Sequence, residues 1–359
     1  MTEHPKVLLL ADLDPQRNPH ALQRRRALER LGCRVTEVDL GRSPGLLRRV
    51  TGGGLDAQVA RALTRDEPDL VLLLGAPELE ADAIRRFREG EGGRAVWANW
   101  LPFDLASVDQ AIPQAAACDH CFAIGSDVAA HVGASLGREV GVLPLAADPS
   151  VYRPHHSRDQ YRANVVFAGR ATPRREALLA EVLEFGLALR GPGWRQTSLR
   201  DYCRGEALDT EEFVRAYGGA SVAINIHERA PGASATEGSC NQRLFEIAAI
   251  GVPQVVDRRG DLPDHYTPGV ECFVFDEAAD LKSAVEMVLL DPPAAQGVAE
   301  AARRTTLTRH TYMHRVRELL RRVGCAPDPA AARSPRSEDA GAEDGMSSYL
   351  TSGSRSESA

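Results

Sequence analysis

The stretch Ser239-Cys-Asn-Gln-Arg-Leu-Phe-Glu-Ile-Ala-Ala-Ile-Gly-Val-Pro-Gln-Val-Val256 decides the fold class of this 359-residue chain. Its apolar spacing predicts a helix that starts with Ser239 and Gln242 as a capping box and stops at the following glycine. Residues 253–256 then predict a short buried strand, so the helix ends against a parallel sheet, where α/β proteins bind ligands. Glu246 lies in the middle of the helix, where its carboxylate can accept hydrogen bonds from two neighbouring sugar hydroxyls.

The rest of the chain alternates short aliphatic runs with helical patterns. Strands are predicted at residues 7–10, 34–38, 70–74, 95–98, 121–124, 140–143, 164–168, near 187, 222–226, 254–256 and 272–275. This alternation predicts two α/β domains in tandem, each with a doubly wound parallel sheet.

A change in composition marks the boundary between these domains. Pro, Asp, Tyr, Arg and His accumulate around residues 144–157, so we place the domains at 1–154 and 155–325. The pattern is purely helical from 281 to about 323. The tail, 326–359, is rich in Ser, Ala, Pro, Asp and Glu and is predicted to be disordered.

Composition and charge exclude several classes of protein. A net charge of −7 and a pI near 5.9 argue against a general nucleic-acid or membrane-surface binder, which needs a positive field. No apolar run approaches the length of a membrane span, and the N-terminal residues lead directly into a strand. We therefore expect a soluble, cytoplasmic protein.

Sequence motifs give little support for a metal or a redox cofactor. Cys118-Asp-His-Cys121 has the spacing of a zinc ligand pair, but no second pair stands at a suitable distance, so two ordinary buried thiols are favoured. Asp12-Leu-Asp14 has a metal-binding form but fits an ordinary strand-to-helix loop. The chain contains neither a dinucleotide fingerprint nor a P-loop, which argues against dehydrogenases and kinases.

Two helix starts in the second half are candidate anion sites. Thr172 is a predicted N-cap, so Arg174 and Arg175 fall in the first helical turn, where positive charge opposes the helix dipole. A phosphate or diphosphate bound there explains their placement; solvated arginines are the alternative. Gly238 and Ser239 can present backbone amides to a second anion oxygen, or form an ordinary capping loop.

These motifs resemble, in this order along the chain, the group-one glycosyltransferases of the GT-B fold. The matching segments are Gly169-Arg170 with Arg175, then Phe245-Glu-Ile-Ala-Ala-Ile-Gly-Val-Pro253, Asp261-Leu-Pro-Asp264 and Asp291-Pro292. Asn241-x-Arg243-x-Phe245-Glu246 and Arg309-His-Thr-Tyr312 with Arg315 are similar to the CgeB-like, spore-protein-type branch.

The resemblance implies two Rossmann-like domains facing a cleft, with a nucleotide-diphosphate sugar as co-substrate and neither cofactor nor metal. Arg170 and Arg175 would neutralise the donor diphosphate, and Glu246 would hold the ribose hydroxyls. The other donor-binding residues it implies are Glu237, Gly238, Ser239, Asn241 and Arg243. Retention of anomeric configuration and hexosyl transfer are the superfamily expectations.

The chain departs from the superfamily pattern at two places. Where relatives have the first of two spaced glutamates, this chain has Gly238, with Glu237 one residue away. The histidine that many relatives carry in the first domain is replaced within residues 99–104, and Asp104 is our candidate for the group that positions or deprotonates the acceptor. The alternative for Asp104 is a helix N-cap.

The sequence thus favours a metal-independent glycosyltransferase with an unidentified acceptor. A non-catalytic sugar-nucleotide binder or structural surface protein is the main alternative, and a nucleotide-sugar epimerase is a third.

Overall fold

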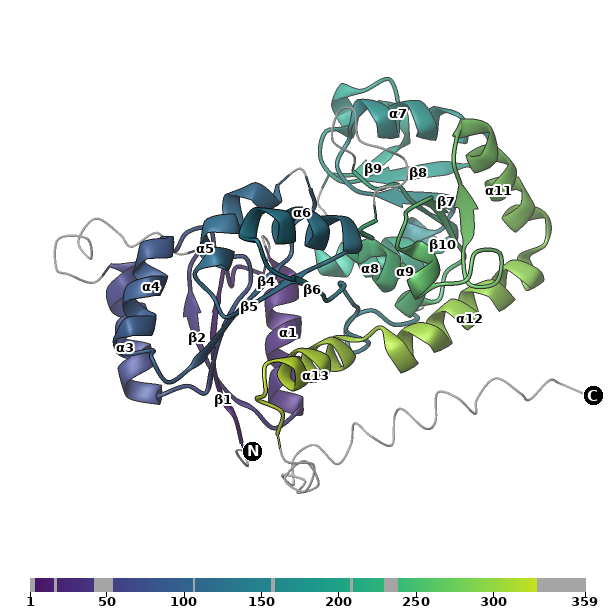
Figure 1. Ribbon diagram of the computed structural model, residues 1–359. Coiled ribbons are helices and arrows are strands. Elements are labelled where there is room, and N and C mark those ends of the chain that lie inside the picture. Colours follow the sequence, from purple (N-terminus) through teal and green to yellow (C-terminus); the bar gives the residue numbers. More distant parts are fainter. Residues whose placement is uncertain are drawn as a thin grey trace, which may run out of the picture.

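The computed structural model describes residues 4–15, 18–41, 54–105, 107–155, 159–206, 209–228 and 238–327. It consists of two lobes, each built on a six-stranded, wholly parallel sheet with flanking helices (Figure 1). The two predicted α/β units with parallel sheets are therefore confirmed.

The first sheet has the strand order β2-β1-β3-β4-β5-β6. Its strands are β1 (Lys6–Ala11), β2 (Arg34–Asp39), β3 (Leu70–Leu73), β4 (Val96–Leu101), β5 (His120–Ala123) and β6 (Gly141–Val142). The helices of this lobe are α1 (Pro19–Arg30), α3 (Leu55–Asp66), α4 (Ala81–Glu89), α5 (Ile112–Ala116) and α6 (Ser126–Leu136). The strand order reverses direction between β1 and β3, so the carboxyl ends of these strands form a topological switch point beside α1.

The second sheet has the order β12-β11-β10-β7-β8-β9. Its strands are β7 (Ala163–Ala168), β8 (Leu187–Arg190), β9 (Cys203–Gly205), β10 (Ala220–Asn225), β11 (Gln254–Asp257) and β12 (Phe273–Phe275). The helices are α7 (Pro173–Ala180), α8 (Thr210–Gly218), α9 (Gln242–Ile250), α10 (Leu262–His265), α11 (Ala278–Leu290) and α12 (Pro292–Arg309). Here the reversal falls between β7 and β10, and the loops that follow them carry most of the predicted site residues.

The C-terminal helix α13 (Tyr312–Arg322) leaves the second lobe and packs against α1 of the first (Figure 1). At the crossing, the backbone of Ala147 pairs with the segment around Thr311: Ala147 N donates to His310 O, and Tyr312 N donates to Ala147 O, both at 3.1 Å. The predicted range 155–325 thus includes a helix that completes the core of the first lobe. The predicted tail lies outside the described residues from 328 onward.

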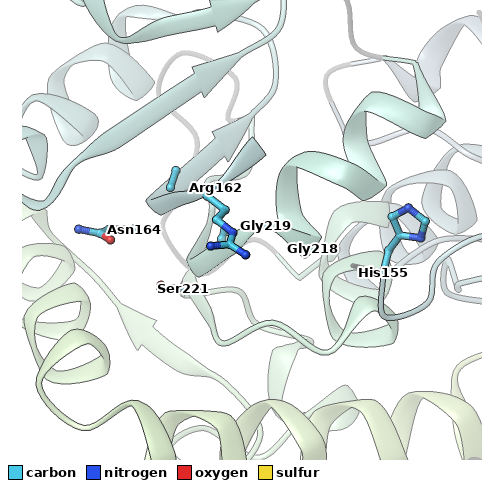
Figure 2. A pocket seen from close by; sticks show the side chains of 8 residues that line it. His155, Arg162, Asn164, Gly218, Gly219 and Ser221 are labelled. Carbon is cyan, nitrogen blue, oxygen red and sulfur yellow. The ribbon is translucent and has the colours of Figure 1, made fainter. Parts of the chain in front are cut away.

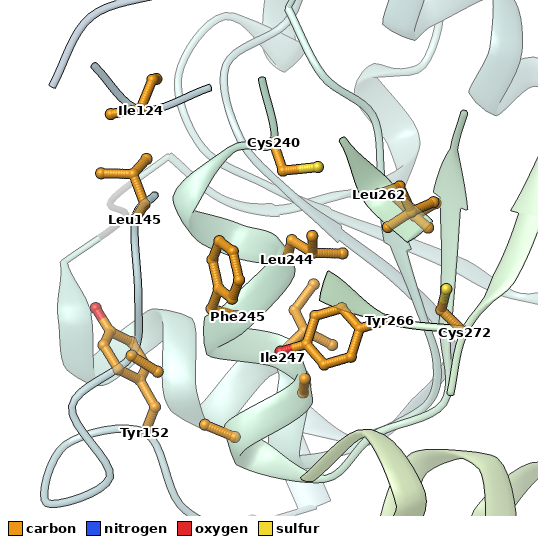
Figure 3. Close-up of a cluster of buried hydrophobic side chains, with 14 of the residues drawn as sticks. Ile124, Leu145, Tyr152, Cys240, Leu244, Phe245, Ile247, Leu262, Tyr266 and Cys272 are labelled. Carbon is orange, nitrogen blue, oxygen red and sulfur yellow. The ribbon is translucent and has the colours of Figure 1, made fainter. Parts of the chain in front are cut away.

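One hydrophobic core runs from the first lobe into the second (Figure 3). Ile124, after β5, and Leu145, in the connecting segment, belong to the same cluster as Cys240, Leu244 and Phe245 around the start of α9. The face of the first lobe that carries α6 is therefore joined by apolar packing to the loop that precedes α9.

The decisive helix α9 starts later than the sequence suggested. Its N-cap is Asn241, whose side-chain oxygen accepts from Leu244 N at 3.0 Å, so the predicted capping box of Ser239 and Gln242 is wrong. Ser239 stands two residues before this N-cap, and its amide and hydroxyl donate instead to a carboxylate of the other lobe. The C-terminus is as predicted: Gly251 adopts a φ of 84°, which favours glycine.

All seven cysteines are free thiols. Cys118 and Cys121 are both buried, and burial raises the pKa of Cys121 to about 12. Across the described ranges, no group of three or more His, Cys, Asp or Glu side chains is placed to hold a metal ion, and no helix is long and apolar enough to cross a membrane.

Candidate donor site

The centre of the site is Arg175, a buried arginine in the first turn of α7. Thr172 caps this helix as predicted, accepting from Arg175 N at 3.3 Å. The guanidinium reaches across the carboxyl ends of the strands and donates to Ile226 O at 2.8 Å and to Arg170 O at 3.0 Å. It also donates to the Glu228 carboxylate at 3.0 Å.

A second guanidinium, that of Arg243, approaches from the first turn of α9. Arg175 and Arg243 both lie over the ring of Phe167, with Cζ 5.3 and 5.6 Å from the ring centroid. A Cβ at Gly169 would lie 3.0 Å from Arg243 Nη2, so the glycine at this turn permits the close approach. Burial, followed by the charge of Arg243, lowers the pKa of Arg175 to about 10.

The cations of this cluster outnumber their ion-pair partners. Arg170, two-thirds exposed, lies 3.3 Å from Glu228, the same carboxylate that Arg175 uses. Within the described residues, Glu228 is the only carboxylate that forms an ion pair with Arg170, Arg175 or Arg243, and Arg243 Nε is buried without a hydrogen-bond partner. We call these three arginines the arginine cluster; an anion with several oxygens matches its unbalanced charge.

Arg174 makes different contacts from its neighbour. It donates to the buried carboxylate of Asp257 at 2.9 Å and to His227 O at 3.1 Å. His227 Nδ1 lies 2.6 Å from Asp257, and its Nε2 accepts from Asn241 N at 3.0 Å, which fixes the neutral ring with the proton on Nδ1. Burial alone would raise the pKa of Asp257, but His227 and Arg174 hold it at about 2.

Glu246 is buried, and burial raises the pKa of its carboxyl to about 7. Tyr152 partly offsets this rise in the pKa of Glu246, while Oε1 is buried with no hydrogen-bond partner among the described residues. His20, at the start of α1 in the first lobe, places its Nδ1 3.7 Å from this oxygen, and that nitrogen is also unpartnered. Two unsatisfied polar atoms, one from each lobe, therefore face each other beside the arginine cluster.

Three other predicted donor-binding residues, Gly238, Ser239 and Asn241, already have partners within the protein. The Asn241 side chain caps α9 and exchanges hydrogen bonds with Asn225 at 2.8 and 3.1 Å. The amides of Gly238 and Ser239 both donate to Asp127 of the first lobe. Glu237 lies outside the described residues.

The acceptor candidate, Asp104, lies in a turn after β4. It accepts from Ser107 Oγ at 2.7 Å, and its carbonyl accepts from Val108 N at 2.9 Å at the start of a short 3-10 helix. Among the described residues, no hydrogen bond or ion pair joins Asp104 to the arginine cluster.

Sequence reasoning missed the contributions of the first lobe. His20 lies at the switch point of the first sheet, and that position, rather than any motif, is the signal that would have singled it out. Tyr152 belongs to the connecting segment, which the sequence suggested only as a boundary.

A surface pocket also lies in the second lobe, at the opposite ends of the same strands (Figure 2). Arg162, Ala163 and Asn164, at the start of β7, line it together with residues 218–221 before and within β10. Ligands of parallel sheets bind at the carboxyl ends, so this pocket is not the donor site.

The class of protein follows from comparison with solved structures: the chain has the GT-B fold. It matches HepE of Anabaena, solved with UDP and glucose, at a TM-score of 0.63 and 14% identity, over 89% of this chain and 100% of HepE. Sucrose-phosphate synthase of Thermosynechococcus elongatus matches at 0.64 and 14%, over 90% and 100%. A glycosyltransferase involved in avilamycin A biosynthesis matches at 0.58 and 17%, over 90% and 98%.

A family match adds to this structural similarity, and it covers mainly the second lobe. Residues 174–321 match the family described as glycosyl transferase-like. No curated protein matches the chain in sequence.

Proposed function

We propose that the protein is a glycosyltransferase that moves a sugar from a nucleotide-diphosphate sugar to an acceptor. The observation that carries the proposal is the arginine cluster, whose charge exceeds that of Glu228, next to the unsatisfied carboxylate oxygen of Glu246. A diphosphate matches the first feature and a ribose diol matches the second. Uridine diphosphate is the ligand to test first, because HepE was solved with it.

In this proposal the arginines supply the electrostatic part of catalysis. Negative charge develops on the leaving diphosphate as the bond to the sugar breaks, and guanidinium groups already in place stabilise it. Glu246 and His20 hold the ribose hydroxyls, so both lobes contribute to the nucleoside site. Because the cations come from side chains, we propose a reaction without a metal ion.

The finer assignments rest on the sequence. Retention of configuration, hexosyl transfer, the CgeB-like branch and the role of Asp104 toward the acceptor follow from the resemblance, and the cytoplasmic location is the expectation from the apolar pattern of the chain. The acceptor itself is unidentified.

Calorimetry with UDP tests the proposal. Arg170→Ala removes an exposed member of the arginine cluster and is expected to weaken UDP binding about tenfold, the loss of one charge-assisted hydrogen bond. Arg200→Ala is the matched control, since Arg200 is exposed and pairs only loosely with Asp201 at 3.9 Å. An unchanged Kd in Arg170→Ala and in Arg243→Met would refute the donor site.

A non-catalytic sugar-nucleotide binder or structural surface protein is the second candidate, favoured by the engagement of the Gly238 and Ser239 amides with Asp127. Incubation with a panel of nucleotide sugars separates the two. Slow donor hydrolysis supports the transferase, whereas tight binding without any turnover supports the binder. Isomerised donor in NMR spectra would indicate an epimerase.

A further inference from the structure

Two carboxylates cross between the lobes in opposite directions, at the loop that precedes α9. Asp127, in the first turn of α6, accepts from Gly238 N at 3.0 Å, from Ser239 N at 3.1 Å and from the Ser239 hydroxyl. In return, Asp261 of the second lobe accepts from Ser126 N at 2.7 Å and from the Ser126 hydroxyl. Each carboxylate therefore bonds a backbone amide and a serine hydroxyl of the other lobe.

Two glycines make this contact possible. A Cβ at Gly125 would lie 2.6 Å from Ser239 Cα, and a Cβ at Gly238 would lie 2.5 Å from Ser126 Oγ and 2.7 Å from Asp261 Oδ1. The first of these is a backbone atom, which no side-chain rotation can move aside. Neither glycine has a left-handed φ, so close approach between the lobes, not backbone conformation, explains their presence.

The two arms of the contact are not equivalent. Asp261 N donates to Gly238 O at 3.0 Å, so Asp261 is tied to the same loop whose amides Asp127 binds. Within the described part of that loop, Asp127 is bonded through its side chain alone. A rotation of the Asp127 side chain thus frees the two amides while the bonds between Asp261 and Ser126 stay in place.

The chemistry of the amides makes the Asp127 arm significant for ligand binding. The amides of Gly238 and Ser239 are the groups expected to meet an anionic oxygen of the donor, and a carboxylate already occupies them. A negatively charged donor and the Asp127 carboxylate cannot both bind these two amides, and their charges repel.

We propose that Asp127 and Asp261 are positioning residues that form a reciprocal clasp between the lobes, and that a donor diphosphate displaces Asp127 from the Gly238 and Ser239 amides. The displacement rests on the proposed function; the clasp itself does not. Asp261 keeps the lobes together while the donor binds, and Asp127 returns when the nucleotide leaves.

The first measurement needs no ligand. Hydrogen–deuterium exchange of the full chain, resolved to residues 238 and 239 by fragmentation, reports whether these amides are bonded. We expect Asp127→Ala to speed their exchange at least about tenfold, because both lose their acceptor. Glu139→Gln is the matched control: it removes an exposed charge from the same lobe shortly after α6 and should leave the exchange unchanged.

The second measurement is UDP affinity by calorimetry. If Asp127 competes with the diphosphate, Asp127→Ala lowers the Kd about three- to tenfold, because the amides no longer have to be vacated. Asp127→Asn retains one acceptor oxygen without the charge and should give an intermediate Kd, which a merely structural role would not produce.

The outcomes separate the clasp from the donor site. Unchanged exchange in Asp127→Ala overturns the clasp. Faster exchange with an unchanged or higher Kd overturns the competition. If neither the parent protein nor Asp127→Ala binds UDP although exchange responds, the donor site and the competition both fail and only the interlobe contact stands.

Discussion

Arg174 and Arg175 are neighbours in the same helical turn, yet they have opposite surroundings. Arg174 faces Asp257, a carboxylate with no exposed surface that also binds His227. Arg175 shares the half-exposed Glu228 with Arg170 and lies beside the partly unpartnered Arg243. The difference teaches that an arginine at a helix start indicates a ligand only where the fold leaves its charge unmatched. We expect Arg174 to serve stability and the arginine cluster to serve binding.

The largest expected effect comes from removing the partner of Arg174. Asp257→Ala leaves Arg174 and the buried His227 without their shared carboxylate, so we expect the free energy of unfolding to fall by about 3–5 kcal/mol. Chemical denaturation followed by circular dichroism measures this. The control is Asp276→Ala, which breaks an exposed pair with Arg258 and should cost less than about 1 kcal/mol. Equal losses in the two variants would contradict the distinction.

Glu246→Gln tests whether the carboxyl beside the arginine cluster is buried, through the pH dependence of protein stability. Folding raises the pKa of Glu246 from 4.5 to about 7, so the folded state holds this proton more tightly and stability falls as pH rises from 4.5 to 7. The glutamine has no such dependence. We expect the variant to gain at most about 3 kcal/mol above pH 7. The gain should disappear below pH 4.5, and thermal unfolding at pH 4 and pH 8 compares the two; a gain at both pH values would contradict the assignment.

The smallest of the three effects compares an arginine of the cluster directly with Arg174. Arg243→Met retains an apolar stem over Phe167 but loses the charge, so UDP binding should weaken about 30-fold, or about 2 kcal/mol. Stability should stay within about 1 kcal/mol, because the lost cation was incompletely paired. Arg174→Met should do the reverse, with lower stability and an unchanged Kd. Calorimetry measures the Kd for UDP of both variants, and chemical denaturation measures their free energies of unfolding.

Most of the fold could be predicted from the sequence because strands and helices of a parallel α/β protein have local periodicity. All strands of both sheets were anticipated except β9, whose three residues, Cys203–Gly205, are too few and too polar to show a pattern. The N-cap of α9 was placed at Ser239 instead of Asn241, since both are good caps and only contact with the other lobe decides between them.

The site could be predicted only in part. Arg170, Arg175 and Arg243 lie together, with Glu246 three residues after Arg243 on the same helix, and their role in donor binding stays a proposal. What the sequence concealed were partners distant along the chain. Asp257 is 83 residues from Arg174, and His20 lies in the other lobe from Glu246. Such pairs leave no spacing signal in a single sequence.

The pairing of Ala147 with the segment around Thr311 has a consequence for movement. The chain passes between the lobes twice, and these two passages are hydrogen-bonded to each other beside Ala147. Sliding one passage past the other would break these bonds, so the pairing keeps the two passages in register. Since α13 follows the second passage and fills the core of the first lobe, cutting the chain after His310 would remove both that passage and part of the core.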